Sequence, residues 1–314
     1  MLLLVSVHPT KPSQHVIAIF GVGLIGGAVK SALHLSNDFT ESSLPFTWST
    51  PAEQSSELSE ISQKISACQT NDKQISRISI LWSAGKGGFG TSADELEIEF
   101  QSFTNVLKFA ESVSESFSDA LIDFNLVSSA GGLFEGQSLV NNDSVPKPFR
   151  PYGELKLRQE NALRVSTGRL HKFIYRPSSV YGLAHEGKRA GLISVILQSG
   201  IQHRVLSLVG NQNTLRDFVF SRDIGQFIAE QLLDTPTTHE TVCHTLASGR
   251  PTSIHEIQEN AERVLRRKVY FVFSGVNRNA ADITYSPRML PNSWTPIDIA
   301  TGIRLVHQNM QTQA

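Results

Sequence analysis

Apolar stretches of strand length alternate with amphipathic stretches of helix length along the first half of the chain. The strand-like stretches are rich in β-branched and aromatic residues, and glycine, proline or serine bounds most of them. We predict strands at residues 15–20, 44–48, 75–84, 121–127 and 173–176, and helices at 28–35, 51–69, 92–113 and around 152. Strands that alternate with helices in this way predict a doubly wound α/β fold with a parallel sheet.

Two later helix starts carry capping residues. Ser92, followed three positions later by Glu95, is a capping box that predicts the start of the helix reaching about Val113. Ser253 is the predicted cap of a helix that runs to Leu265. A short strand at residues 269–273 and a last helix around 302–307 complete the pattern.

A glycine-rich turn follows the first of the long strands. Gly21, Gly23 and Gly26 stand in the order G-x-G-x-x-G between a predicted strand and a predicted helix, with Leu24 and Ile25 inside the turn. The first glycine permits the tight turn, the second permits close approach of a pyrophosphate, and the third permits packing of the helix on the strand. The free N–H groups of the helix would face the phosphates. The alternative is a glycine-rich turn without a ligand.

The residues after the predicted strand at 44–48 leave the choice of dinucleotide open. A fold that binds NAD usually carries an acid for the adenine ribose about 20 residues beyond the glycines. Ser49, Thr50 and Pro51 stand there instead, and Glu53 is the first carboxylate after them. No arginine is present for the 2′-phosphate of NADP either. We therefore expect NAD or NADP, with Ser49 beside the adenine ribose.

Tyr152 and Lys156 are the candidate catalytic pair. On a helix their spacing places both side chains on one face, about one turn apart. A tyrosine hydroxyl has an ordinary pKa near ~10 and is a poor base at neutral pH. A neighbouring ammonium favours the phenolate, so the pair predicts a tyrosine that acts in acid–base catalysis. The same spacing also occurs on solvated helices that have no such role.

Four features follow one another along the chain: the glycine turn, the double serine 128–129, the pair Tyr152 and Lys156, and the segment 176–182, RPSSVYG. This order resembles the extended short-chain dehydrogenase/reductase family of nucleotide-sugar epimerases, dehydratases and reductases. The resemblance implies a Rossmann-type doubly wound parallel sheet at residues 13–177. It also implies a smaller, mainly substrate-binding lobe at 178–314, with segments that return to the Rossmann domain. We expect residues 1–12 to be an N-terminal extension. The short stretch between the predicted helix at 51–69 and the predicted strand at 75–84 leaves little room for the third strand of the family, which we expect to be missing or vestigial.

The resemblance also implies site residues. Ala84, Gly85 and Pro177 would border the cofactor, and Lys156 would hydrogen-bond the nicotinamide ribose. Ser129, with Ser128 as the second candidate, would orient the reacting sugar hydroxyl, unless both serines only satisfy backbone groups at a strand end. The candidates for the sugar nucleotide are Ser179, Leu192, Arg216 and Arg278, of which the two arginines would hold the diphosphate.

Three positions depart from the family pattern. Ser179 stands where many relatives have asparagine, and Glu99 stands where an asparagine often lies near the catalytic group, so no role is transferred to Glu99. Ala130 and the glycine after it replace the acid pair that dehydratases of the family carry, which argues against dehydration.

The role of Arg216 has an alternative: it could form a surface salt bridge to Asp217 or Asp223 and make no phosphate contact.

Composition excludes several other classes. The 314 residues carry 28 basic and 29 acidic side chains, a net charge of −1, so no overall field attracts nucleic acid or an anionic membrane. Cys68 and Cys243 are too few for a disulfide framework, and the ten histidines lack metal-ligand spacing. The apolar start, residues 1–7, is too short to span a membrane. We expect a cytoplasmic protein, with a homodimer as one possibility.

These observations predict an NAD- or NADP-dependent enzyme that transfers a hydride to and from a nucleotide-linked sugar. Segments 191–195 and 216–219 most resemble the epimerases, so a sugar epimerase is the first hypothesis. A nucleotide-sugar 4-ketoreductase or dehydrogenase is the alternative within the family. A cofactor-binding protein without catalysis, acting as a sensor or assembly partner, is the alternative from another class, and the intact Tyr152 and Lys156 pair argues against it.

Overall fold

The computed structural model describes residues 1–7, 13–36, 38–70, 72–85, 87, 91–182, 191–238, 240–274 and 281–312. The chain divides into two compact units. Unit 1 comprises Met1–Leu133, Pro148–Arg176 and Gly225–His244, and unit 2 comprises Phe134–Lys147, Pro177–Ile224 and Thr245–Ala314. Residues 225–244 belong to unit 1, in keeping with the expectation that segments of the later lobe return to the Rossmann domain, whereas residues 134–147, expected in the Rossmann domain, lie in unit 2.

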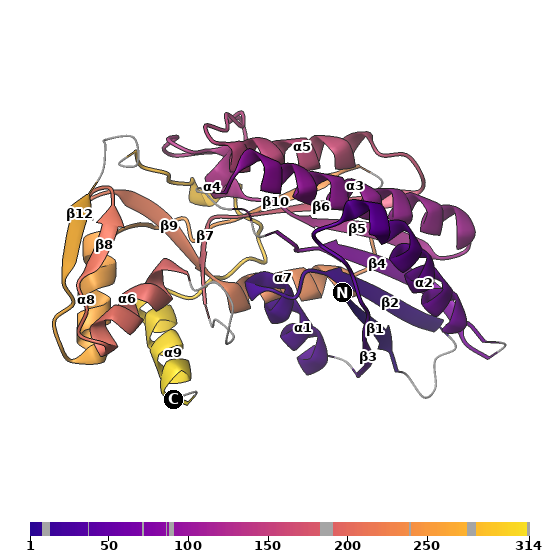
Figure 1. Ribbon diagram of the computed structural model, residues 1–314, viewed down its shortest axis with the longest axis horizontal. Helices are drawn as coiled ribbons and strands as arrows, with labels where there is room; N and C mark the ends of the chain where they lie inside the picture. The colour runs from indigo at the N-terminus through magenta and orange to yellow at the C-terminus, as the bar shows by residue number, and fades with distance from the viewer. Residues whose placement is uncertain are drawn as a thin grey trace. The chain divides into compact units, whose positions relative to one another are not determined.

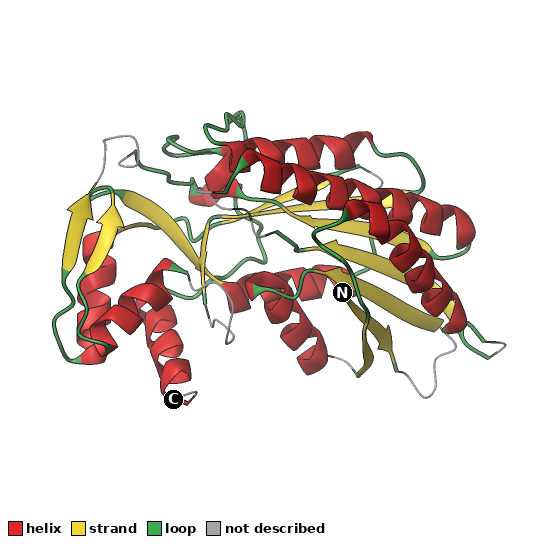
Figure 2. Cartoon of the chain, viewed as in Figure 1, coloured by secondary structure: helices red, strands yellow, loops and turns green. Residues whose placement is uncertain are grey.

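A seven-stranded sheet is the centre of unit 1 (Figure 2). Its strands are β1 (Leu2–Ser6), β2 (Ser13–Phe20), β3 (Phe39–Ser43), β4 (Gln74–Trp82), β5 (Leu121–Val127), β6 (Leu170–Pro177) and β10 (Val242–Leu246). Their order is β10-β6-β5-β4-β2-β1-β3. β2, β4, β5 and β6 are mutually parallel, as the alternation of strands and helices predicts. The buried, β-branched composition of these strands fits a sheet that is covered on both faces.

The first residues of the chain are part of this sheet and are not a peripheral extension. β1 pairs antiparallel with β2, with Leu2 opposite Ile19, and antiparallel with β3 on its other side. Leu3 and Leu4 are 3% and 0% exposed. The physical reason is the continuous apolar run at the start of the chain, because a strand with neighbours on both sides and helices over both faces can bury every side chain.

The predicted strand at residues 44–48 is wrong, and β3 lies just before it. Aromatic packing accounts for the apolar character of this segment: the Phe46 ring is 5.1 Å from that of Phe20, and the Trp48 ring is 5.9 Å from that of Trp82. β3 itself, FTESS, is mostly exposed. An exposed strand at the edge of a sheet lacks the apolar alternation on which the prediction depends.

Helices cover both faces of the sheet, as Figure 1 shows. One face carries α2 (Gln54–Ala67), α3 (Ala93–Ser116) and α5 (Pro151–Val165), and the other carries α1 (Leu24–Ser36) and the part of α7 (Ser221–Leu233) that belongs to unit 1. Gly225 of α7 packs directly on Ala28 of α1. The capping box of Ser92 and Glu95 at the start of α3 is confirmed.

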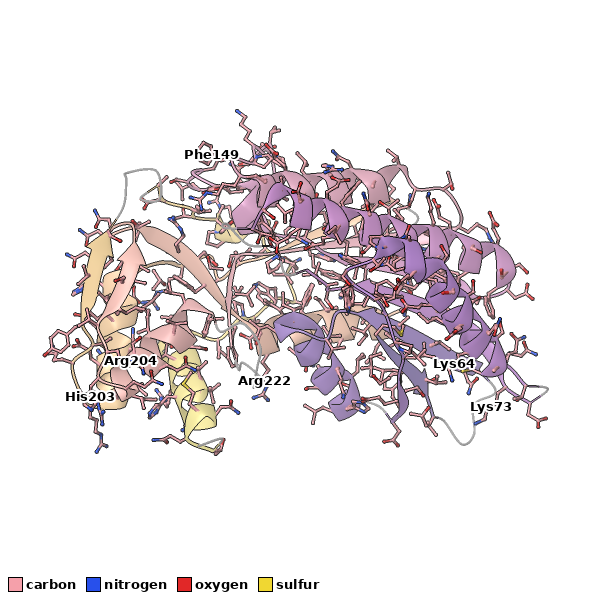
Figure 3. The ribbon with its side chains drawn as sticks, viewed as in Figure 1. Lys64, Lys73, Phe149, His203, Arg204 and Arg222 are labelled. Carbon is pink, nitrogen blue, oxygen red and sulfur yellow. The ribbon has the colours of Figure 1, made fainter. Side chains whose placement is uncertain are left out.

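Among the described residues between α2 and β4, the structure has no strand. The short 3₁₀ helix η1 (Pro51–Glu53) precedes α2, and an isolated bridge between Thr70 and Lys73 closes the turn into β4. Figure 3 shows Lys64 near the end of α2 and Lys73 in this turn. The chain thus passes directly from α2 to β4, which lies next to β2.

Unit 2 has two small sheets and three helices of its own among the described residues. One sheet has the order β11-β9-β7, and the other pairs β12 with β8. The elements are β7 (Ser179–Tyr181), α6 (Leu192–Ile201), β8 (Leu206–Val209), β9 (Leu215–Phe220), β11 (Pro251–Ser253), α8 (Ile254–Leu265), β12 (Phe271–Ser274), η3 (Pro287–Met289) and α9 (Ile299–Thr312). Ile193, Phe220, Ile257 and Ile303 belong to the apolar core that joins them. The predicted cap Ser253 accepts from the Glu256 backbone N–H.

Candidate active site

Parallel strands of unit 1 bring several predicted site residues together at the carboxyl-terminal end of the sheet. β2, β4, β5 and β6 share their direction, so the segments that follow Phe20, Trp82 and Val127 begin at the same edge. These segments hold the glycine turn, Ala84 with Gly85, and the double serine 128–129. The carboxyl ends of parallel strands are the usual place for ligands in open α/β sheets.

The glycine turn fits the pyrophosphate of a dinucleotide. Gly21 has φ 99°, and a Cβ there would overlap the backbone of Ala84. A Cβ at Gly26 would overlap the carbonyl oxygen of Gly21, which also accepts a hydrogen bond from the Ser83 hydroxyl at 2.7 Å. A Cβ at Gly23, by contrast, would have no described atom within 4 Å. Two glycines are thus required by packing, whereas Gly23 leaves open space above the turn.

Three of the predicted neighbours of the cofactor lie in α1 and in a loop after β3. Leu24 and Ile25, both partly buried, form the first turn of α1, whose N-terminal N–H groups are available to an anion. Ser49 is exposed in the loop between β3 and η1. Glu57 fixes this loop at Thr47, because its carboxylate accepts from the Thr47 N–H at 2.8 Å and from the Thr47 hydroxyl at 2.7 Å.

Tyr152 and Lys156 lie in the first two turns of α5. Pro151 occupies the first turn of this helix, and the exposed side chain of Phe149 lies just before it (Figure 3). The Tyr152 ring packs against Gly132, where an added Cβ would lie 3.1 Å from two ring carbons. The Lys156 Nζ lies 5.8 Å from the centroid of the Tyr152 ring. The cation is therefore close enough to act on the charge of the tyrosine oxygen.

Lys156 is buried in a polar cluster that the sequence did not predict. Its Nζ donates to the Glu99 carboxylate at 3.1 Å and to the Gln159 side-chain oxygen at 3.0 Å. The side chains of Lys156 and Glu99 are only 5% and 9% exposed. Burial by itself lowers the pKa of the Lys156 ammonium, but the adjacent Glu99 carboxylate raises that pKa above its ordinary value. Lys156 is therefore a cation at neutral pH.

The two serines at the end of β5 have different surroundings. The Ser129 hydroxyl accepts from the Gly132 N–H at 3.1 Å and so opens the short helix α4 (Ala130–Leu133). Since Gly132 also packs against the Tyr152 ring, Ser129 and Tyr152 share one neighbour. The Ser128 hydroxyl instead donates to Glu160 at 2.7 Å.

Glu160 is the centre of a second buried cluster. Its side chain is 1% exposed, and its carboxylate accepts from the Arg176 Nε at 2.8 Å as well as from Ser128. Sequence reasoning missed both Gln159 and Glu160. Two adjacent polar residues on the buried side of the helix that carries Tyr152 were the available indication, because a polar group is buried only where it has a partner.

The described substrate candidates, Ser179, Leu192 and Arg216, lie in unit 2. Ser179 begins β7, and Leu192 begins α6 and packs on the core of the unit. Pro177, a predicted neighbour of the cofactor, is the last residue of β6. Arg216 on β9 donates to the backbone oxygens of Leu215 and Ala281. Arg278 lies outside the described residues.

Asp217, one of the alternative partners of Arg216, has a structural role. It is 2% exposed and accepts from the Ser178 hydroxyl at 2.6 Å and from the backbone N–H groups of Ser248 and Gly249. Burial raises the pKa of its carboxyl, although these hydrogen bonds lower it. The carboxylate therefore ties β9 to the loop that precedes β11.

The described residues show neither a metal site nor a membrane-spanning helix. They contain no group of three or more histidine, cysteine, aspartate or glutamate side chains that could hold a metal ion. The helices in the described part of the chain are all too short or too polar to cross a bilayer.

Comparison with known proteins supports the resemblance that the sequence predicts. Residues 91–239 match the model of the NAD dependent epimerase/dehydratase family. No curated protein sequence matches the chain. The UDP-glucose 4-epimerase of Thermus thermophilus, solved in complex with NAD, is 14% identical, with a TM-score of 0.73 over 95% of this chain and 99% of the other.

Two further solved structures are similar along almost their whole length. Another UDP-glucose 4-epimerase is 19% identical, with a TM-score of 0.72 over 96% of this chain and 98% of the other. RMD from Pseudomonas aeruginosa, complexed with NADPH, is 15% identical, with a TM-score of 0.71 over 97% of this chain and 100% of the other. These likenesses confirm the predicted Rossmann-type α/β fold. Together with the match over residues 91–239, they confirm the resemblance of this chain to the NAD-dependent epimerase/dehydratase family, the extended short-chain dehydrogenases and reductases.

Proposed function

We propose that this protein is an NAD- or NADP-dependent oxidoreductase that acts on a nucleotide-linked sugar, with a sugar epimerase as the first candidate. The observation that carries the proposal is the pair of Tyr152 and Lys156 at the edge of the sheet that also holds the glycine turn. Two of the similar structures are UDP-glucose 4-epimerases, and one of these contains NAD. The family model that matches residues 91–239 names the same class of cofactor.

The chain offers a dinucleotide a suitable site. Gly21, Gly23 and Gly26 form a turn, and no described atom lies within 4 Å of a Cβ placed on Gly23, so a phosphate could approach the backbone there. The N-terminus of α1 would supply N–H donors for the phosphates. Ala84 and Gly85 would border the nicotinamide side. Ser49 neither repels nor clasps a 2′-phosphate, so we expect the dissociation constants for NAD and NADP to agree within about tenfold.

Tyr152, Ser129 and Lys156 would each have a separate role in the reaction. A bound nicotinamide would accept or supply the hydride. Tyr152 would take the proton of the sugar hydroxyl in oxidation and return it in reduction. Ser129, which shares the neighbour Gly132 with Tyr152, would orient that hydroxyl. Two of the three N–H donors of Lys156 have partners among the described residues, which leaves one for the nicotinamide ribose.

In unit 2, Arg216 is the described candidate for the diphosphate of the sugar nucleotide. A planar guanidinium binds phosphate oxygens in a bidentate manner, and Arg216 is held on β9 by backbone acceptors. Arg278 would be the second cation, while Ser179 and Leu192 would contact the nucleotide or the sugar. A homodimer is the proposed assembly, to be tested by light scattering.

A nucleotide-sugar 4-ketoreductase is the second candidate. It is favoured by one observation, the carboxylate of Glu99 against Lys156, because a cation that is already paired supports a phenolate base less than a lone one. The cofactor content of the purified protein separates the two candidates. An epimerase recycles its cofactor within one turnover and should retain it, whereas a reductase exchanges cofactor at each turnover and should be purified largely empty.

The substitution Tyr152→Phe tests the proposed chemistry. It keeps the ring packing and removes the hydroxyl, so turnover of a UDP-hexose should fall by roughly 10² to 10⁴ while NAD or NADP binding is unchanged. Tyr270→Phe is the matched control, because Tyr270 is 64% exposed in unit 2. If Tyr152→Phe and the control retain activity within a few-fold of the wild type, the proposal is wrong.

A further inference from the structure

Glu99 makes a close charged contact with Lys156, and the family resemblance assigns it no role. The Glu99 Oε1 lies 3.1 Å from the Lys156 Nζ and accepts at 3.3 Å from Gln159, which itself contacts Lys156. All three side chains are buried between α3 and α5. The carboxylate is therefore fixed by two donors on the helix that carries Tyr152.

The loop after β4 closes over this carboxylate. A Cβ at Gly85, which has φ 146°, would lie 2.8 Å and 2.9 Å from the two carboxylate oxygens of Glu99. A Cβ at Gly87 would lie 3.0 Å from the Tyr152 ring and 3.3 Å from the second oxygen of Glu99. The backbone of this loop thus contacts both side chains, and Glu99 belongs to the same small volume as Tyr152.

The charges in this volume nearly cancel. The charged and titratable groups that face Lys156 within the described chain are Glu99 on α3, and Tyr152 and Glu160 on α5. Glu160 is itself paired with Arg176. A single buried ammonium stabilises a phenolate, but an ammonium with a carboxylate 3.1 Å away has little net charge to offer.

We propose that Glu99 is a positioning residue of this site, which keeps Tyr152 in its protonated form by offsetting the charge of Lys156, so that proton donation to a carbonyl is favoured over proton abstraction from an alcohol. The inference rests on the proposed function and favours its second candidate, the ketoreductase. In the favoured step the carbonyl would become an alcohol: a reduced nicotinamide, when bound, would supply the hydride for the new C–H bond, and Tyr152 would give its proton to the new O–H bond. Solvent would then return a proton to the phenolate.

A second ion pair on the same two helices provides a matched control. Glu97, two residues before Glu99, pairs with Arg158, two residues after Lys156, at 2.8 Å. Those side chains are 46% and 48% exposed, so solvent screens their charges. Glu97→Gln therefore removes the same charge from the same pair of helices without entering the buried volume.

The test measures the ionisation of Tyr152 directly and needs neither cofactor nor substrate. Near-ultraviolet phenolate absorbance is recorded against pH for the wild type, Glu99→Gln, Glu99→Asp and Glu97→Gln. The spectrum of the same protein with Tyr152→Phe added is subtracted in each case. In Glu99→Gln the Tyr152 phenolate should form about one pH unit lower than in the wild type. Glu99→Asp, which keeps the charge, and Glu97→Gln should match the wild type.

Two outcomes would overturn the inference. If the Tyr152 phenolate forms at the same pH in Glu99→Gln as in the wild type, Glu99 does not control the proton of Tyr152. If circular dichroism shows that Glu99→Gln is unfolded, Glu99→Asn takes its place, and failure of both to fold makes the carboxylate a structural requirement and overturns the inference as well. Loss of the proposed function would be seen separately, as a Tyr152→Phe enzyme that turns over at the wild-type rate.

Discussion

Replacing Glu160 with glutamine removes one negative charge from the interior of unit 1 and leaves the shape of the side chain almost unchanged. The carboxylate is 1% exposed, and Arg176, which it holds at 2.5 Å and 2.8 Å, is 14% exposed. Removing one partner of a buried ion pair typically costs about 3–5 kcal/mol, because the remaining charge is left uncompensated. The amide oxygen can still accept one hydrogen bond, so we expect a loss near the lower end, about 3 kcal/mol.

Glu97→Gln is the control for this prediction as well. Its partner Arg158 is 48% exposed, and an exposed pair contributes about 0.5 kcal/mol. Urea unfolding is best followed by tryptophan fluorescence in a Trp294→Phe background, because the two remaining tryptophans, Trp48 and Trp82, both lie in unit 1. If the two glutamine variants lose the same stability, burial does not govern the energy of the Glu160 pair and the reasoning fails.

Three further predictions concern the turn, the first strand and a buried histidine. Gly23→Ala should keep the wild-type melting temperature and weaken NAD or NADP binding at least about tenfold by calorimetry, whereas Gly21→Ala, at φ 99°, should lower the melting temperature sharply. Leu4→Ala should cost about 2–5 kcal/mol in urea unfolding, and Leu35→Ala, 79% exposed, less than about 0.5 kcal/mol; equal losses would remove Leu4 from the core. Burial lowers the pKa of His15 to about 3, so the unfolded chain takes up a proton below pH ~6.5 that the folded chain does not. Between pH 8 and 5, His15→Gln should therefore lose about 1–2 kcal/mol less stability than the wild type, and parallel pH profiles would contradict this.

The parallel part of the sheet could be predicted from the sequence because its strands are buried on both faces. The predicted strand at 121–127 matches β5 residue for residue, and the predicted capping box opens α3. β3 could not be predicted, since an exposed, polar edge strand has no periodic pattern. The residues of β1 form a short apolar run at the start of the chain, and this run does not indicate that the strand pairs with β2 on one side and β3 on the other.

The candidate site shows the same division between local and distant information. The glycine turn and the pair of Tyr152 and Lys156 are local patterns, so the place of the turn at the start of α1 and of the pair on α5 follows from their spacing in the sequence. The contact of Lys156 with Glu99 joins residues 57 positions apart. No local pattern encodes such a contact, because it depends on how α3 and α5 pack. The sequence could therefore predict that Tyr152 and Lys156 lie on one helix, but not the buried charges that surround Lys156.

The antiparallel β1 has a consequence for how this protein would associate if it were damaged. β3 pairs with β1, and β1 pairs with β2, so β1 connects the last strand of the sheet to the parallel strands. Proteolytic removal of β1 would expose the backbone N–H and C=O groups along one side of β2. An open, apolar strand edge recruits strands from other molecules. A chain that has lost β1 should thus form β-rich aggregates. Any stored preparation should therefore be checked for the presence of its first residues.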